Sequence, residues 1–204
     1  TLLQSKRNAP SSSGLENLFV AVGERFAHLQ KHCASDNWKH RQSAIKQLPK
    51  AGPKAIPILG LLLRTDPDQD VRIASAESLG QYHTDEALPP LFDGLKDGST
   101  MVRIAAAEAI GALGFSSAKT ALQDALEIES DYFPKPAMIN ALAAVGDSAS
   151  VPLLEQFLND ERRGPKGEGR ICDVAWHGIE MITARLANEV PNKRIERDSG
   201  KAAE

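Results

Sequence analysis

Apolar residues recur at every fourth position in four short stretches of the chain. Successive stretches start 32, 31 and 31 residues apart. Positions four apart lie on one face of an α-helix, so each stretch predicts an amphipathic helix with a single buried stripe. The stripes are Ala55/Leu59/Leu63, Ala87/Leu91/Leu95, Ala118/Leu122/Leu126 and Ala149/Leu153/Phe157.

A second pattern lies between these stretches, in which a basic residue precedes a core aliphatic residue by seven positions. Small residues dominate the positions between them, which favours close packing of neighbouring helices. The clearest copies are residues 71–80 and 102–111, which both begin with VRIA. The basic residues and their aliphatic partners are Arg41 with Leu48, Arg72 with Leu79, Arg103 with Ile110, and Lys135 with Leu142.

Each period therefore predicts two antiparallel helices joined by a short turn, and a fixed period of about 31 residues is typical of repeat arrays. One helix pair cannot bury its apolar face alone, so we expect the pairs to stack. The predicted fold is an all-α superhelix, a solenoid of about five helical hairpins over residues 15–189. A leading helix over residues 15–33 starts this array, and a polar, Gly-rich insertion interrupts the last hairpin at residues 159–169.

Two terminal segments fall outside the predicted array. Residues 1–14 are rich in Ser, Pro and Asn, and residues 190–204 are charged with few apolar side chains. Such compositions are typical of disordered tails, because they offer little apolar surface to bury.

The repeated columns resemble the HEAT-repeat family, in particular the short form named after phycobilisome lyase subunits. Its signature is an Asp six residues before the Arg of the second helix, and here Asp66 precedes Arg72 and Asp97 precedes Arg103. The resemblance implies that these side chains form a ladder between neighbouring repeats, since an Arg fork can hold a carboxylate and helix-end carbonyls together. Cys172 stands at the Arg position of the last repeat, so the ladder should end there.

The resemblance also implies a non-enzymatic scaffold or adaptor, including inhibitors of the immunity-protein type and regulators, that binds a protein partner. The binding surface would be the concave face, formed by the second helix of each pair. We expect Ile73 and Ile104 to lie exposed side by side as an apolar contact, unless neighbouring helices partly cover them. The expected binding residues are Lys46, Lys50, Ile73, Glu77, Gln81, Ile104, Glu108, Asn140 and His177.

Two further functions remain open at this point. The resemblance supplies the first alternative, a chromophore lyase-like subunit that acts on a bilin. The second is nucleic-acid binding, as in other HEAT-like proteins. A net charge of −3, a pI near 6.0 and an aromatic content of 5% oppose nucleic-acid binding, because cations and stacking side chains are both scarce.

The insertion carries a basic cluster that is a candidate secondary site: Arg162, Arg163, Lys166 and Arg170. Its Gly-rich segment lacks the GK[ST] ending and the preceding strand of a phosphate loop. Both a solvated loop and a functional loop fit this segment, because long loops in compact arrays often carry function.

We expect no catalytic residue, metal site, cofactor or small-molecule ligand. His28 and His32 share a helix face, but no third ligand stands at a supporting spacing, so we interpret them as part of a solvated face. Cys33 and Cys172 fall in distant repeats, so a disulfide is not expected and the chain is predicted to be cytoplasmic. No apolar run is long enough to span a bilayer, so we expect no membrane association.

Overall fold

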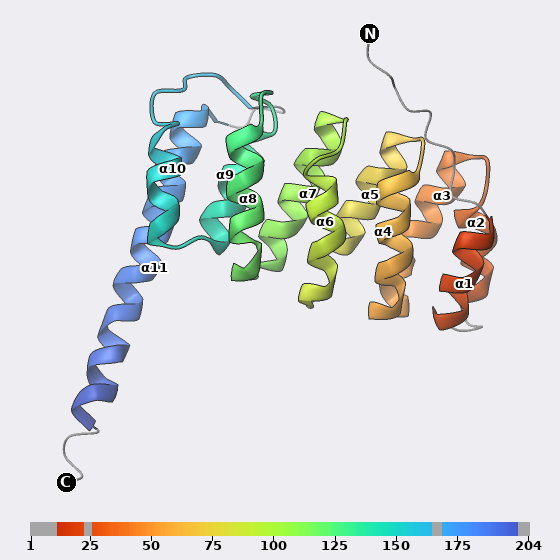
Figure 1. Cartoon of the computed structure of the whole chain (residues 1–204), viewed down its shortest axis with the longest axis horizontal. Coiled ribbons are helices and arrows are strands. Elements are labelled where there is room, and N and C mark those ends of the chain that lie inside the picture. The colour runs from red at the N-terminus through yellow and green to blue at the C-terminus, as the bar shows by residue number, and fades with distance from the viewer. Residues whose placement is uncertain (1–11, 23–25, 165–168, 200–204) are drawn as a thin grey trace.

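The computed structural model describes residues 12–22, 26–164 and 169–199. Its helices form two rows, and successive helix pairs stack side by side along one axis (Figure 1). The described residues form helices and turns, with one isolated antiparallel bridge between Arg163 and Arg170. The predicted all-α solenoid is therefore confirmed.

Each repeat contributes one helix to each row. The first row consists of α1 (Ser12–Val22), α4 (Ile56–Thr65), α6 (Leu88–Gly94), α8 (Lys119–Ile128) and α10 (Val151–Glu155). The second row consists of α3 (Trp38–Ile45), α5 (Gln69–Leu79), α7 (Thr100–Leu113), α9 (Lys135–Val145) and α11 (Ile171–Ser199). An additional helix, α2 (Ala27–Cys33), packs against both α1 and α3. Short 3-10 turns precede the later first-row helices: η2 (Leu48–Ala51), η3 (Pro53–Ala55), η4 (Asp85–Ala87), η5 (Ser116–Ala118) and η6 (Ser148–Ser150).

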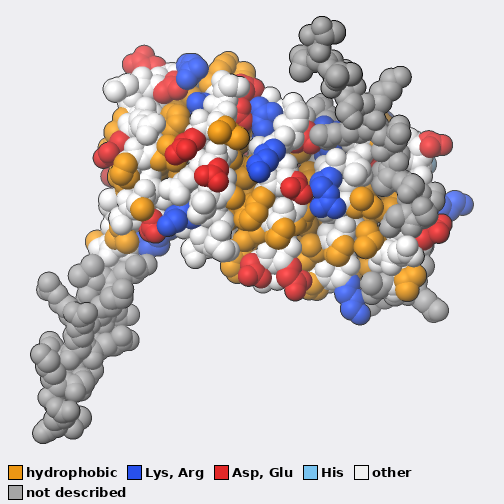
Figure 2. Space-filling view, in the orientation of Figure 1, with side chains coloured by type: hydrophobic (Ala, Val, Ile, Leu, Met, Phe, Trp, Pro, Cys, Tyr) orange, Lys and Arg blue, Asp and Glu red, His pale blue; other side chains and the backbone are white. Residues whose placement is uncertain are grey.

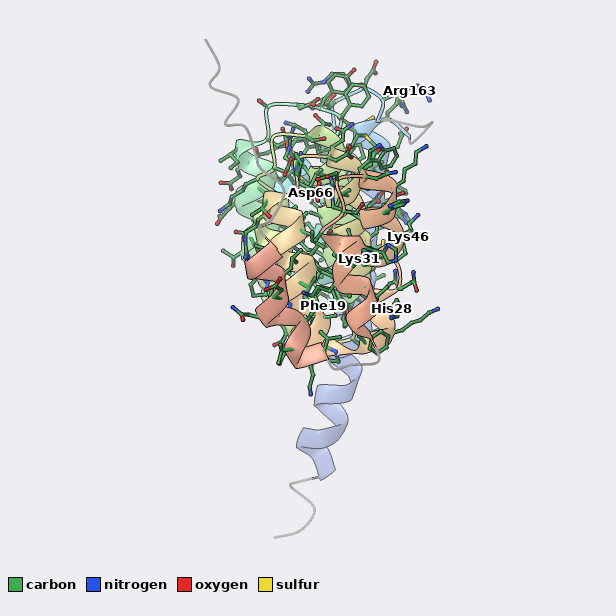
Figure 3. The ribbon with its side chains drawn as sticks, turned by 90° about the vertical axis from the view of Figure 1, so that its right-hand side faces the viewer. Phe19, His28, Lys31, Lys46, Asp66 and Arg163 are labelled. Atoms are coloured by element: carbon green, nitrogen blue, oxygen red, sulfur yellow. The ribbon has the colours of Figure 1, made fainter. Side chains whose placement is uncertain are left out.

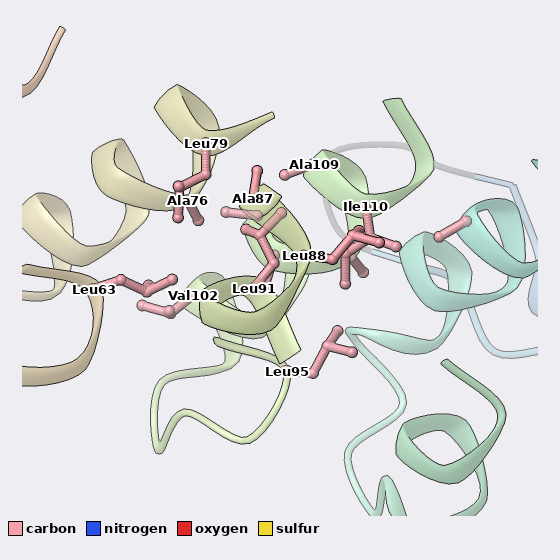
Figure 4. Close-up of a cluster of buried hydrophobic side chains, with 14 of the residues drawn as sticks. Leu63, Ala76, Leu79, Ala87, Leu88, Leu91, Leu95, Val102, Ala109 and Ile110 are labelled. Carbon is pink, nitrogen blue, oxygen red and sulfur yellow. The ribbon is translucent and has the colours of Figure 1, made fainter. Parts of the chain in front are cut away.

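The core runs continuously between the two rows. The stripe residues Leu59, Leu91 and Leu122 have no exposed surface, as the four-residue spacing predicts. Figure 4 shows the layer around α6, where Leu91 lies between Leu79 of one repeat and Ile110 of the next. Stacking therefore buries apolar surface that a single helix pair would leave in water.

Small residues set the spacing of the second row. A Cβ atom on Gly80 would lie 3.0 Å from the Cα of Ala109 on α7. The same relationship recurs one repeat later, where a Cβ on Gly111 would lie 3.1 Å from the Cα of Ala141 on α9. Neighbouring second-row helices thus approach so closely that only glycine and alanine fit between their backbones.

Local signals set where the second-row helices begin and end. The side chain of Asn37 accepts a hydrogen bond from the Lys39 amide at 3.0 Å, and that of Asp68 accepts one from the Asp70 amide at 2.9 Å. These are N-cap bonds, which satisfy amides that have no partner inside the helix. Helix α7 ends at Gly114 with φ of +71°, a left-handed conformation that glycine adopts without a steric cost.

The expected single leading helix over residues 15–33 is wrong in one respect, because the structure has two helices there. Helix α1 ends at Val22 and α2 begins at Ala27, and residues 23–25 lie outside the described residues. Helix α1 packs against α4 whereas α2 packs against α3, so one straight helix would not serve both contacts. The inward residues still follow the predicted stripe: Leu15, Phe19, Leu29 and Cys33 are buried.

The expected terminal tails also need correction. Helix α1 already begins at Ser12, and α11 continues to Ser199, well inside the segment expected to be a charged tail. Low hydrophobicity does not end a helix by itself, because straight-chain Lys, Arg and Glu have high helix propensity. Residues 1–11 and 200–204 lie outside the described residues. No helix among the described residues combines the length and apolar character needed to cross a membrane.

The insertion is anchored to the start of the last helix. The amide of Ile171 donates to the Arg162 oxygen, and the amide of Cys172 donates to the Asp160 oxygen, both at 2.9 Å. Residues 165–168 lie outside the described residues. The described part of the insertion is thereby held at the end of the array where α11 begins (Figure 1).

Candidate functional site

At successive steps of the array, an arginine of one repeat binds a carboxylate of the next repeat. Arg72 on α5 donates from Nε and Nη2 to the carboxylate of Asp97 in the following repeat, at 2.9 and 3.0 Å. Its Nη1 donates to the backbone oxygen of Asp66 in its own repeat, at 2.9 Å. Both members of the Arg72–Asp97 pair are buried. The same two-bond pairing joins Arg41 to Asp66 (2.7 and 2.8 Å) and Arg103 to Glu129 (2.6 and 3.2 Å).

The next step of this ladder has a different arrangement. Lys135 occupies the arginine position, but its Nζ lies 5.2 Å from the centroid of the Phe157 ring. The carboxylate of Asp160, 25 residues after Lys135, instead accepts bonds from Nε and Nη2 of Arg162 at 2.9 and 2.7 Å. The bonds from Arg162 lower the pKa of Asp160. The insertion therefore supplies the guanidinium that the repeat itself lacks.

The second-row helices and the turns that follow them present polar side chains on the face expected to be concave. Seven of the nine expected binding residues are exposed: Lys46, Lys50, Glu77, Gln81, Glu108, Asn140 and His177. Glu77 and Glu108 occupy equivalent positions on α5 and α7, whereas Lys46 precedes them at the N-terminal end of the array. The face is thus basic at one end and acidic in the middle. Binding of a partner at this face stays a prediction.

The expected exposed pair of isoleucines is absent from this face. Ile104 is only 5% exposed, and Ile73 is half-buried. Ala74 and Ala105, which directly follow the two isoleucines, are buried as well. Close approach of the second-row helices explains this error, because short side chains on neighbouring helices leave little room for water beside the isoleucines.

A hollow of about 760 Å³ lies at the N-terminal end of the array, between α2 and α3. Its lining includes His32 and His40, whose ring centroids are 6.1 Å apart, and the exposed Lys31 (Figure 3). His28 is exposed on the same helix but does not line the hollow. Among the described residues, no three His, Cys, Asp or Glu side chains are placed to hold a metal ion together.

A smaller hollow of about 470 Å³ lies at the C-terminal end of α9. Arg185 on α11 lines it and donates to the backbone oxygens of Ala144, at 2.8 Å, and Gly146. Lys119 and Asp147 form an ion pair of 2.8 Å at its edge, and the bond from Lys119 lowers the pKa of Asp147. Sequence reasoning missed Arg185, because it belongs to no repeated column.

The first-row face carries mixed charges with apolar side chains between them (Figure 2). One hollow of about 500 Å³ on this face is mainly apolar and is lined by Leu18, Ile56, Pro57, Leu61 and Pro90, among others. The row therefore also offers contact surface, although the sequence analysis placed binding on the opposite row.

The basic cluster predicted in the insertion is exposed in its described part. Arg162 is paired with Asp160, and Arg170 is paired with Asp173 at 2.9 Å. The side chain of Arg163 makes no hydrogen bond or ion pair within the described part of the chain. Lys166 lies outside the described residues.

Two aromatic residues that sequence reasoning missed lie beside this cluster. Tyr132 and Phe133 precede α9, and their ring centroids are 4.4 Å apart with a tilt of 31°. The guanidinium carbon of Arg162 lies 5.4 Å from the Tyr132 ring centroid. The insertion and the loop before α9, which precede second-row helices of neighbouring repeats, are therefore in contact.

The two cysteines differ in their burial. Cys33 is buried, and this burial raises the pKa of its thiol to about 12, so it stays protonated at neutral pH. A thiol in that state is a poor nucleophile. Cys172 is half-buried at the start of α11, with its Sγ 3.9 Å from a carboxylate oxygen of Asp173.

A family model of HEAT repeats matches residues 26–99 and 88–165, which together make up more than half of the chain. An uncharacterized phycocyanin operon protein Z from Pseudanabaena tenuis is 30% identical over 131 residues, or 60% of this chain and 64% of that protein. Conserved virulence factor C from Staphylococcus saprophyticus is 31% identical over 102 residues, or 48% of this chain and 27% of that protein. The chain spans less than two thirds of the length of each of these relatives.

A solved structure with the same architecture is the complex of CpcE and CpcF of phycocyanin lyase from Nostoc sp. PCC7120. The match has a TM-score of 0.64 and 23% sequence identity, and it covers 78% of this chain and 65% of that chain. At this level of identity the likeness shows the fold.

These similarities correct the main functional expectation from the sequence. A general non-enzymatic scaffold or adaptor was expected, with a bilin lyase-like subunit as the alternative. The names of a relative and of a structural neighbour both refer to phycocyanin, and one refers to its lyase. They favour the alternative over the general scaffold.

Proposed function

The chain belongs to the HEAT-repeat family, and from this premise we propose that it is a subunit of a bilin lyase-type assembly. In this role it helps a phycobiliprotein acquire its bilin. The observation that carries the proposal is the 30% identity over 131 residues to a phycocyanin operon protein. The shared fold of the phycocyanin lyase complex supports it as an architecture suited to that task.

Attachment of the bilin does not require a nucleophile from the lyase. The thiol of the acceptor protein adds to an exocyclic double bond of the bilin: one C–S bond forms, the thiol proton ends on the bilin, and nothing leaves. The assembly therefore needs to hold the bilin and the acceptor protein in a reactive orientation, which lowers the entropic cost of the reaction. A long, rigid array is suited to such positioning because it presents many side chains at fixed spacing.

We place the acceptor protein on the second-row face. Glu77 and Glu108 stand exposed in the middle of this face, and Lys46 and Lys50 stand exposed at its N-terminal end. Opposite charges along one surface orient a partner whose own charges run in the reverse order. Short side chains between them allow a partner to approach the backbone of the helices.

The test uses affinity-tagged chain mixed with apo-phycocyanin and phycocyanobilin. We expect the tagged chain to retain both the apoprotein and the blue pigment. If both wash through at micromolar concentrations, the proposed function is wrong.

Charge reversal tests the face separately. The double variant Glu77→Lys with Glu108→Lys should lower apoprotein capture about tenfold, because like charges across an interface repel. A matched double variant on the first row, Asp124→Lys with Glu127→Lys, changes the net charge equally on exposed positions of α8. Equal loss of capture in both variants would contradict the placement of the acceptor protein.

A further inference from the structure

We propose that Tyr132, Phe133, Arg162 and Arg163 form a binding site for a planar conjugated ligand that carries carboxylates. We name these four residues the aromatic–arginine ledge. This inference rests on the proposed function, under which the ligand is the bilin, a chain of conjugated pyrrole rings with two propionate side chains.

Two departures from the repeat meet at the ledge. The spacing between equivalent second-row positions is 31 residues from Arg41 to Arg72 and from Arg72 to Arg103. It rises to 32 residues between Arg103 and Lys135 and to 37 residues between Lys135 and Cys172. The residues added between Asp160 and Cys172 form the insertion, which supplies the arginine members of the ledge. Helix α9 begins at Lys135 itself, whereas α5 and α7 begin three residues before Arg72 and Arg103, so Tyr132 and Phe133 lie in the loop before α9.

These two loops are in contact at one end of the array. Both leave the helices at the upper edge in Figure 1, and the contact between Arg162 and Tyr132 joins them. Figure 3, a view turned by 90°, shows Arg163 at the same upper edge, above Asp66. Helix stacking does not require either departure, because Gly80 and Ala109 make the same close contact between α5 and α7, where neither departure occurs.

The aromatic members present surface that the two preceding repeats lack at this place, although Trp38 in the first repeat stands three residues before Arg41, as Tyr132 stands before Lys135. The loop before α5 reads Pro67-Asp68 and the loop before α7 reads Gly98-Ser99, both without an aromatic residue. Phe133 is 37% exposed and lies against the Tyr132 ring at 4.4 Å. Tyr132 is half-buried, so Phe133 is the exposed ring of the pair. An exposed aromatic ring has a solvation cost, and it provides a flat face on which conjugated rings can stack.

The two arginines of the ledge differ in whether their guanidinium groups are already paired. Asp160 occupies Nε and Nη2 of Arg162, which holds the guanidinium against Tyr132. Arg163 is exposed, and its side chain is unpaired within the described part of the chain, so its fork is available for a carboxylate. Arg170 is already paired with Asp173.

One neighbouring carboxylate opposes this assignment and makes it testable. Glu161 is exposed between Asp160 and Arg162, and its charge repels an anionic ligand. Removing that charge should strengthen binding, which a purely structural role for the ledge would not produce. The other nearby carboxylate, Asp131, already accepts bonds from Thr100 and the Phe133 amide.

The experiment titrates phycocyanobilin with the full chain and records the visible absorption band. We expect a red-shifted, narrowed band with wild type. Phe133→Ala should raise the dissociation constant about fivefold through lost stacking, and Arg163→Gln about threefold through a lost exposed ion pair. Glu161→Gln should lower it about twofold, and Lys119→Gln, at a distant exposed ion pair, should leave it unchanged.

The outcomes separate this inference from the proposed function. If wild type shifts the bilin band and the variants at Phe133, Arg163 and Glu161 all titrate like wild type, the ledge is not the site and the proposed function stands. If wild type leaves the bilin spectrum unchanged, the ledge is overturned, and retention of apo-phycocyanin by the tagged chain decides the proposed function separately. Circular dichroism of each variant confirms that the helices are intact, because these exposed residues lie outside the core.

Discussion

Arg72 and Asp97 lie 25 residues apart in sequence, yet they form a buried two-bond ion pair that ties one repeat to the next. The third nitrogen of the same guanidinium holds the Asp66 carbonyl in the preceding turn. One side chain therefore fixes both the end of its own first-row helix and the position of the neighbouring repeat.

Removing one member of this pair should be costly. Arg72→Ala leaves the Asp97 carboxylate buried without its main partner, so we expect a loss of about 3–5 kcal/mol in the free energy of unfolding. Urea titration followed by circular dichroism measures it. The matched control is Arg64→Ala, which removes an exposed pair with Asp93 at 3.5 Å and should cost less than about 1 kcal/mol. Equal losses for the two variants would contradict the role of the buried pair.

The close approach of second-row helices can be tested at glycine. Gly80→Ala places a Cβ 3.0 Å from the Ala109 backbone, so one helix must shift, and we expect a loss of about 1–3 kcal/mol in thermal or urea unfolding. Gly98→Ala is the control, because a Cβ there meets no atom within 4 Å. Equal stability of the Gly80 variant and wild type would mean that the helices are not packed this tightly.

The two thiols should be distinguishable by alkylation. With iodoacetamide at pH 8, Cys172 should react in the native protein, whereas Cys33 should react only after denaturation, because burial raises its pKa to about 12. The folded state holds the Cys33 proton more tightly than the unfolded state, whose thiol has an ordinary pKa of 9.0. The stability contributed by this group is therefore present below about pH 9 and is lost as pH rises toward 12. Rapid native labelling of both cysteines would contradict this.

Arg185 should stabilise the end of the last complete repeat. Its bonds to the Ala144 and Gly146 carbonyls satisfy acceptors that the end of α9 leaves open, so Arg185→Ala should cost about 1–3 kcal/mol. Amide hydrogen exchange should increase at the C-terminal turn of α9 and stay unchanged in α5. If the amides of α9 exchange at the same rate in the variant as in wild type, the bonds from Arg185 are dispensable.

The repeat period predicted most of the fold, because identical neighbours impose the same burial pattern on each copy. It therefore predicted which residues form the apolar stripes, including Leu59, Leu91 and Leu122. The pattern could not predict that Ile104 is buried, since that depends on how closely two helices approach and not on which face the side chain occupies. Charge composition likewise could not show that α11 continues to Ser199.

The sequence predicted the candidate sites less well than it predicted the fold. The four basic residues of the insertion were identified by composition, but the two that are ion-paired, Arg162 and Arg170, could not be told from the unpaired Arg163. Tyr132 and Phe133 stand before the predicted second helix of their repeat, outside the apolar stripes on which the prediction relied. The adjacent aromatic pair, in a chain with only 5% aromatic residues, is the signal that would have pointed to them.

Covalent attachment of bilin to apo-phycocyanin tests the proposed role most directly. The assay incubates apo-phycocyanin and phycocyanobilin with and without the chain, alone and together with a second phycocyanin lyase subunit, and measures zinc-enhanced fluorescence of the acceptor band after denaturing electrophoresis. We expect the chain to raise the initial rate of covalent labelling at least about tenfold in one of these mixtures, because two reactants are then positioned together. Equal labelling rates with and without the chain in every mixture would contradict it.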